Sequence, residues 1–149
     1  MGDRANLVIS QTPVDAAQPL AQVLPGTIVL YTHWGGHDLG PNLAVALAAA
    51  ENRWDDDGYA SRIIVSLIVG ADWAKETGHG LYCGSLGDNQ HPILVLCFPS
   101  MRVLRYGQGY VNPEAAGNAT MTGQWSFAEF SQFSEDRARK AHLEGGGRP

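Results

Sequence analysis

The sequence predicts an α+β fold in which an antiparallel or mixed β-sheet carries two or three helices packed on one face. Its 149 residues are the usual length of one domain and are enough to bury a core. Hydrophobic residues make up 44% and charged residues 17%, as in ordinary globular proteins. Strand-like and helix-like segments follow one another without regular β-α-β alternation, and this order favours the α+β class.

The first half of the chain is expected to form two strands and then two helices. Residues typical of strands occupy Asn6–Ser10 and Gly26–Trp34. Pro41 stands before a stretch rich in alanine and leucine and predicts a helix over 41–52, because proline is tolerated at the start of a helix. Three aspartates followed by apolar residues at helical spacing predict a second helix over 56–69.

The second half is expected to form a short strand, a hairpin, a loop and a last helix. The strand is predicted at Gly80–Cys83, and two apolar runs on either side of Pro99 and Ser100 predict the hairpin, with Pro92 opening its first strand. Glycine, proline and asparagine favour a loop over Gly107–Gly123. The chain is therefore divided into an α+β core at 1–106, a glycine-rich loop at 107–125 and a C-terminal helix and tail at 126–149.

The last helix is expected to begin at Ser126, because Ser126 and Glu129 have the spacing of a capping box. Phe127, Phe130 and Phe133 then form an apolar edge. This edge either packs on the protein's own core or serves to assemble a homo-oligomer.

Composition and charge exclude several classes of protein. The net charge is −5, and the one short basic run is Arg137–Lys140, so no duplex nucleic acid is expected as a partner. The longest apolar run, Ile63–Gly70, is too short to span a bilayer, so no membrane association is expected. Cys83 and Cys97 form no CxxC motif, and no signal peptide is recognised, which favours a cytoplasmic location.

His33 and His37 stand four residues apart in the stretch THWGGHDL. Two histidines at this spacing bind zinc when they lie on one face of a helix, with a glutamate between them in metalloproteases. Here two glycines lie between them, which disfavours a helix, and no spacing selects Asp38, His79 or His91 as further ligands. We therefore expect no metal and, in the absence of a phosphate-binding or dinucleotide-binding motif, no cofactor.

A second interpretation is an enzyme in which His33 and His79 act as general base and general acid on a phosphate ester. The sequence after each histidine, HWG and HGL, lacks the hydroxyl residue that such two-histidine enzymes carry two positions further on. This hydrolase remains the first alternative.

The third interpretation is a pocket for a small anionic or nucleotide-like ligand. Arginines are suited to phosphate or carboxylate, and tryptophans, including Trp73, offer flat faces on which a base can stack. Two glycines after His33 and Trp34 allow a sharp turn at the end of a strand, where ligand sites are common. The predicted ligand-binding residues are Arg4, His33, Trp34, Arg53, Trp54, Arg62, His79 and His91.

Several stretches together resemble a family of small phage and bacterial proteins. They are GDRAN at Gly2–Asn6, YTHWGG at Tyr31–Gly36, RWDDDGYASRI at Arg53–Ile63, ETGHG at Glu76–Gly80 and GDNQHPILVL at Gly87–Leu96. The resemblance covers about the first two thirds of the chain, up to Tyr106, and implies no particular activity.

The leading hypothesis is a cytoplasmic, homo-oligomeric binding protein of phage type that sequesters a nucleotide-derived ligand, such as a host defence signal, without turnover. Besides the hydrolase, a second alternative is a viral inhibitor that acts by direct contact with a host protein.

Overall fold

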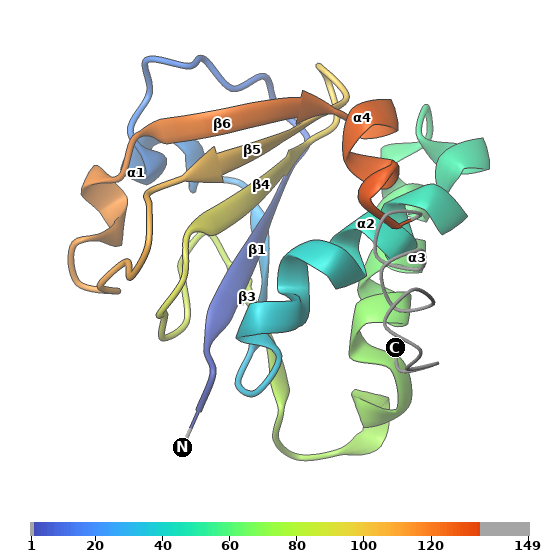
Figure 1. Cartoon of the computed structure of the whole chain (residues 1–149), viewed down its shortest axis with the longest axis horizontal. Coiled ribbons are helices and arrows are strands. Elements are labelled where there is room, and N and C mark those ends of the chain that lie inside the picture. The colour runs from blue at the N-terminus through green and yellow to red at the C-terminus, as the bar shows by residue number, and fades with distance from the viewer. Residues whose placement is uncertain (1, 135–149) are drawn as a thin grey trace, which may run out of the picture.

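A computed structural model describes residues 2–134 and contains one mixed sheet of six strands (Figure 1). The strands are β1 (Ala5–Ser10), β2 (Ile28–Thr32), β3 (His79–Cys83), β4 (Ile93–Cys97), β5 (Arg102–Tyr106) and β6 (Met121–Ser126), in the spatial order β3-β2-β1-β4-β5-β6. The central pair, β1 and β4, is parallel, and all other neighbours are antiparallel. The predicted α+β class with a mixed sheet is therefore confirmed.

The helices are α1 (Leu20–Val23), α2 (Leu39–Ala49), α3 (Asp57–Val69) and α4 (Phe127–Ser131). Short 3₁₀ helices occur at Gly36–Asp38 (η1), Glu51–Arg53 (η2), Gly70–Ala74 (η3) and Ala116–Asn118 (η4). In the described part of the chain, no helix combines the length and the apolar character needed to cross a membrane.

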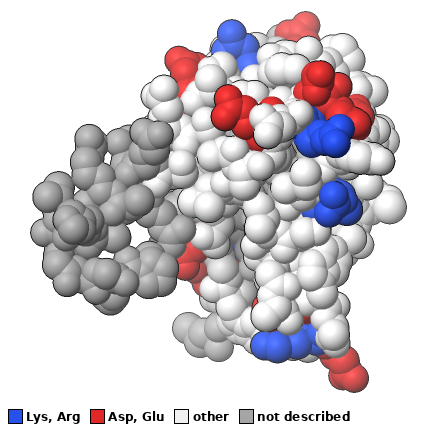
Figure 2. Space-filling view, turned by 90° about the vertical axis from the view of Figure 1, so that its right-hand side faces the viewer, with Lys and Arg blue, Asp and Glu red and all other residues white. Residues whose placement is uncertain are grey.

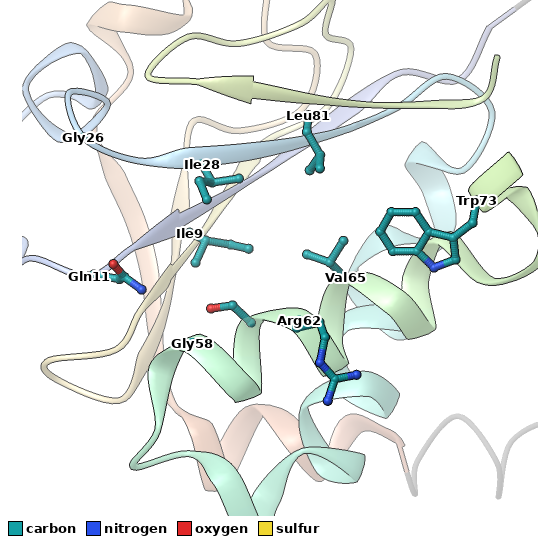
Figure 3. A pocket seen from close by; sticks show the side chains of 10 residues that line it. Ile9, Gln11, Gly26, Ile28, Gly58, Arg62, Val65, Trp73 and Leu81 are labelled. Carbon is teal, nitrogen blue, oxygen red and sulfur yellow. The ribbon is translucent and has the colours of Figure 1, made fainter. Parts of the chain in front are cut away.

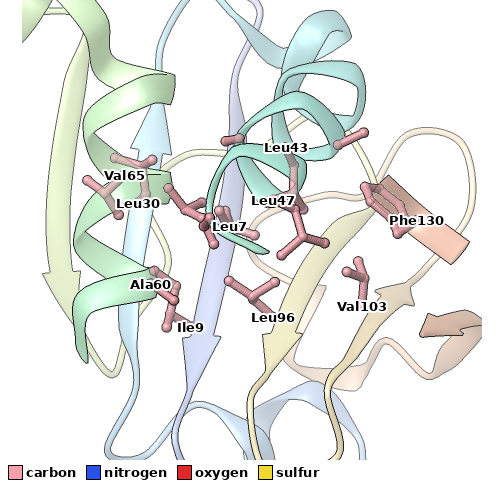
Figure 4. Packing of buried hydrophobic residues seen from close by; sticks show 14 of the residues in the cluster. Leu7, Ile9, Leu30, Leu43, Leu47, Ala60, Val65, Leu96, Val103 and Phe130 are labelled. Carbon is pink, nitrogen blue, oxygen red and sulfur yellow. The ribbon is translucent and has the colours of Figure 1, made fainter. Parts of the chain in front are cut away.

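Three helices cover one face of the sheet, as predicted. α2, α3 and α4 lie on the same side of the strands (Figure 1), and Leu43 and Leu47 of α2 point at the central strands (Figure 4). Phe130 of α4 belongs to the same buried cluster, so the last helix packs on the protein's own core. The sheet contributes Ala5, Leu7, Ile9, Leu30, Leu96 and Val103 to this cluster, and Phe98, directly after β4, belongs to it as well.

The opposite face is also covered, because β1 is buried along its whole length. Alternate residues of a strand point to opposite faces, and Val8 accordingly packs in a second cluster with Leu20 and Val23 of α1. α1 was not predicted from the sequence, since it has only four residues and follows proline-rich turns. Val111 and Ala116, from the segment after β5, complete this cover.

The segment 107–125 is not a loop throughout, because its last residues belong to β6. β6 pairs antiparallel with β5, although the register shifts between Arg105 and Tyr106. Gly123 interrupts the apolar pattern, and the sequence therefore did not predict this strand. Trp125 stabilises it by lying 5.5 Å below the Arg105 guanidinium.

The remaining elements lie close to their predicted positions. The first predicted helix begins two residues earlier and ends three residues earlier than expected, and β2 ends at Thr32 rather than at Trp34. The predicted capping box is present, because Ser126 Oγ accepts from the Glu129 N–H and Glu129 accepts from the Ser126 N–H. The prediction for the end of the helix and the tail falls on residues 135–149, outside the described residues.

A buried asparagine in β1 anchors the segment between β3 and β4. Asn6 donates to the carbonyls of Gly87 (3.4 Å) and Asp88 (2.9 Å) and to Asn89 Oδ1 (3.1 Å), and it accepts from the Gly87 N–H (2.9 Å). Asn89 in turn donates to the carbonyls of His91 (2.6 Å) and Val111 (2.9 Å). Both asparagines are buried, so their hydrogen bonds are costly to lose.

Replacing Asn6→Ala should therefore lower the free energy of unfolding by about 2–3 kcal/mol, because buried groups of the segment 87–89 lose their partner. Asn118→Ala, at an exposed asparagine, should change it by less than about 0.5 kcal/mol. Urea denaturation of both variants measures the difference, and equal stability of the two variants would contradict this role of Asn6.

Candidate functional site

The candidate site lies at the end of the sheet where β2 ends and β1 and β3 begin. Three backbone hydrogen bonds join these segments. Asp3 N–H donates to the His33 carbonyl (2.7 Å), Gly36 N–H donates to the Asp3 carbonyl (2.8 Å), and His33 N–H donates to the Gly78 carbonyl (2.9 Å). The turn after β2, which carries the stretch THWGGHDL, is therefore held by residues distant in the sequence.

The carboxylate of Asp3 joins two histidines. Its Oδ1 lies 2.5 Å from His91 Nε2, and its Oδ2 lies 2.8 Å from His37 Nδ1. The backbone N–H of His37 also donates to Oδ2 (2.8 Å). The two imidazole rings meet edge to face with their centroids 4.8 Å apart.

The hydrogen bonds keep Asp3 ionised. Burial acts to raise the pKa of Asp3, but the hydrogen bonds from His91 and His37 outweigh it and lower the pKa to about 2. Asp3 therefore offers a full negative charge to both histidines at neutral pH.

Gly36 allows His91 to approach the turn. A Cβ at this position would lie 2.6 Å from two atoms of the His91 ring and 2.7 Å from the Asp3 carbonyl oxygen. The second glycine of THWGGHDL thus has a steric role in bringing His91 and Asp3 together.

His33 and His37 have different hydrogen-bond partners. A hydrogen bond of 2.7 Å joins His33 Nδ1 to the hydroxyl of Tyr31, while His37 binds Asp3. The His33 ring also meets Trp34 edge to face, with centroids 4.8 Å apart.

Trp34 and His79 line one cavity of about 230 Å³ together with Asp72. His79 Nδ1 lies 3.5 Å from Asp72 Oδ2, and among the described residues this buried nitrogen makes no hydrogen bond. Burial lowers the pKa of His79, and the charge of Asp72 offsets only part of this effect. His79 is therefore neutral at pH 7.

Two more cavities continue this one along α3 and η3. A cavity of about 190 Å³ shares Asp72 and His79 with it, and a third cavity of about 370 Å³ shares Trp73 and Leu81 with the second. We name these adjoining cavities the α3–β3 groove. It runs from Trp34 at one end to Gln11 and Arg62 at the other.

The widest part of the α3–β3 groove is mainly apolar (Figure 3). Ile9, Ile28 and Leu81 extend from the strands toward Val65 of α3, and Trp73 stands at one end of this space. The polar groups at its edge are Gln11, Ser61 and Arg62, and the buried Ser61 hydroxyl has no hydrogen-bond partner in the part of the chain that the structure describes. In Figure 3 the Arg62 guanidinium points away from the apolar side chains, and Arg62 is exposed at the edge of the groove.

The predicted ligand-binding residues are divided among several places. Trp34, His79 and Arg62 line the α3–β3 groove. His91 belongs to the Asp3 cluster, and Arg4 forms an ion pair of 2.8 Å with Asp88 in the neighbouring segment.

Arg53 and Trp54 lie before the N-terminus of α3, whereas His79 lies near the other end of this helix of 13 residues, about 20 Å long. Arg53 lies over the Tyr59 ring at 5.1 Å, and the indole of Trp54 donates to the Leu47 carbonyl and packs on Phe127. Both contacts are structural, so the structure does not bring these two residues to the others.

Sequence reasoning missed Asp3 and Asp72, although each contacts a predicted histidine. Asp3 lies 34 positions from His37 and 88 from His91. Neither aspartate has a local motif that could have identified it, and only the folded chain brings it to its partner.

Comparisons of the chain with family models, with curated proteins and with solved structures gave no significant match. The resemblance to small phage and bacterial proteins therefore stays a prediction, and the geometry of the chain itself carries the functional argument.

Charges of both signs are scattered over the helix-covered face shown in Figure 2. Among the described residues, lysine and arginine side chains form no continuous patch on this face, and several stand next to acidic side chains. This face therefore offers little to a nucleic acid backbone.

The close approach of His91 to Gly36 is testable by adding one methyl group. Gly36→Ala should lower the free energy of unfolding by about 1–3 kcal/mol, because the new Cβ collides with the His91 ring and the Asp3 carbonyl. Gly40→Ala is the control, since a Cβ there meets nothing within 4 Å and the residue lies in α2. It should leave stability unchanged or raise it by up to about 1 kcal/mol. Chemical denaturation measures both, and a neutral Gly36→Ala would contradict the described packing.

Proposed function

We propose that the protein binds a small molecule with a flat apolar part and an anionic group in the α3–β3 groove, without chemical turnover. The observation that carries the proposal is the apolar cavity of about 370 Å³ between α3 and the strands β1, β2 and β3. Ligand sites typically have volumes of about 300–1,000 Å³ and combine an apolar lining with a few polar groups.

The apolar part of the ligand is expected to lie between the strands and α3. Ile28 and Leu81 are 50% and 57% exposed, and Trp73 is exposed as well, although all three border the same space. A bound molecule would cover these side chains and gain about 25 cal/mol for each Å² of apolar surface removed from water.

The polar part is expected to bind at the edge of the groove. Arg62 supplies a positive charge at the mouth, and the buried Ser61 hydroxyl and His79 Nδ1 have no hydrogen-bond partner in the described residues. A nucleotide-derived ligand fits this class, because its base can stack on Trp73 while a phosphate reaches Arg62.

We also propose that the protein forms a homo-oligomer and that it is located in the cytoplasm. One structural feature supports each of these two proposals. β3 lies at the edge of the sheet and exposes Leu81 and Tyr82, so a second copy could pair with its free edge. The cysteines are both free, Cys83 exposed and Cys97 buried, which suits a reducing compartment.

The probe 8-anilinonaphthalene-1-sulfonate tests the groove, because it combines aromatic rings with one anionic group. It should bind the native protein saturably at one site. Arg62→Gln and Trp73→Ala should each weaken binding of the probe about tenfold. The first variant loses one charge-assisted hydrogen bond, and the second loses one stacked ring. Fluorescence titration gives the dissociation constants.

Arg53→Gln is the matched control, since Arg53 is exposed and lines none of the three cavities of the groove. Its affinity should stay within twofold of the unsubstituted chain. Equal affinity of Arg62→Gln and Arg53→Gln would contradict the proposed groove. Hydrolysis of a bound nucleotide, abolished by His79→Ala, would instead favour the hydrolase.

A further inference from the structure

We propose that Asp3, His37 and His91 form a binding site for one divalent transition metal ion, with Zn²⁺ as the expected ion. The site is separate from the α3–β3 groove and does not depend on the function proposed for it. It also differs from the His33 and His37 pair considered in the sequence, because the ligands come from three separate segments.

The three side chains present their ligand atoms to one point. Asp3 Oδ1 or Oδ2, His37 Nδ1 and His91 Nε2 all lie within 4.8 Å of one another. In a tetrahedral site with bonds of about 2.0–2.1 Å, ligand atoms are separated by about 3.3 Å. The Asp3 contacts of 2.5 Å and 2.8 Å must therefore lengthen to admit an ion. The His37 side chain is 82% exposed, so it can make a small movement of this kind.

The other two ligands are held by the fold. Asp3 is fixed on both sides of its backbone, by the bonds of its N–H to His33 and of its carbonyl to Gly36. The His91 ring lies against Gly36, and its carbonyl accepts from the buried Asn89. Such fixed surroundings lower the cost of ordering the ligands when an ion binds.

The donor set selects the class of ion. Two imidazole nitrogens and one carboxylate oxygen suit Zn²⁺, Fe²⁺, Co²⁺ and Ni²⁺, whereas Mg²⁺ and Ca²⁺ prefer oxygen ligands alone. On binding, the ion takes the place of the protons that now lie between Asp3 and the two nitrogens. Each imidazole then carries its proton on its other ring nitrogen, and a proton passes to solvent only from a ring that was doubly protonated.

One side of the site is open. His37 and His91 line a cavity of about 230 Å³ together with Leu39, Leu94 and Arg105. Arg105 is held there, because its Nε donates to Thr122 Oγ1 and its Nη2 to the Thr122 carbonyl, both at 3.0 Å. Three protein ligands with an open fourth position are typical of zinc sites that bind water or an anion, and the charge of Arg105 favours an anion in this cavity.

The hydrogen bonds of Asp3 to His37 and His91 would also be present if the cluster had only a structural role. In that case Asp3 only bridges two protonated or neutral imidazoles, and the cluster has no affinity for metal. Metal binding by defined variants separates these two roles.

The test uses the full chain without a histidine tag, after removal of metal with a chelator. Co²⁺ uptake is followed by the visible absorption of the tetrahedral ion, and Zn²⁺ uptake by titration calorimetry. We expect one ion per chain. His37→Ala and His91→Ala should each weaken Zn²⁺ binding more than about 100-fold, because a ligand matters more than its supporting groups.

Asp38→Asn and His79→Ala are the matched controls, since one removes the exposed carboxylate next to His37 and the other a histidine outside the cluster. Both should bind within about threefold of the unsubstituted chain. Circular dichroism verifies that each variant is folded. His37→Ala is the decisive variant, because the His37 side chain is exposed and its loss should not prevent folding. Absence of saturable uptake, or equal uptake by His37→Ala and Asp38→Asn, would overturn the proposal.

Discussion

The candidate site depends on the hydrogen bonds between Asn6 and the segment 87–89. Asn6 is buried on the central strand β1 between the apolar residues Ala5 and Leu7, so its amide must be satisfied by protein groups. It binds Gly87, Asp88 and Asn89, and Asn89 then binds the carbonyl of His91. A buried polar network thus determines where His91 stands relative to Asp3, three residues before Asn6.

The sheet and its covering helices explain why an apolar groove lies next to this cluster. α2 and α4 pack on the centre and the β5 side of the sheet, and α3 follows beside β1 and β2. The edge strand β3 extends past this cover, so Leu81 and Ile28 are left half-exposed opposite Val65. The same edge places His79 beside Asp72, where burial keeps the imidazole neutral.

Local patterns in the sequence predicted most of the fold but little of the site. Apolar periodicity and capping residues located β1, α3, the hairpin of β4 and β5 and the start of α4, because these signals act within a few residues. β6 was missed because Gly123 breaks its pattern, and α1 because it is one turn long. Asp3 was missed because its partners are distant in the sequence. Trp54 was predicted to bind a ligand because of its flat ring, but this ring packs on Phe127 at the core.

The proposed metal centre unites Asp3, His37 and His91 and is separate from His33 and His79. Long-range ¹H–¹⁵N NMR spectra of the imidazole rings, recorded during addition of one equivalent of Zn²⁺, test it most directly. We predict that the signals of His37 Nδ1 and His91 Nε2 move to the positions of metal-bound nitrogens while His33 and His79 keep theirs. Unchanged spectra, or metal-bound signals at His33 or His79, would contradict the claim.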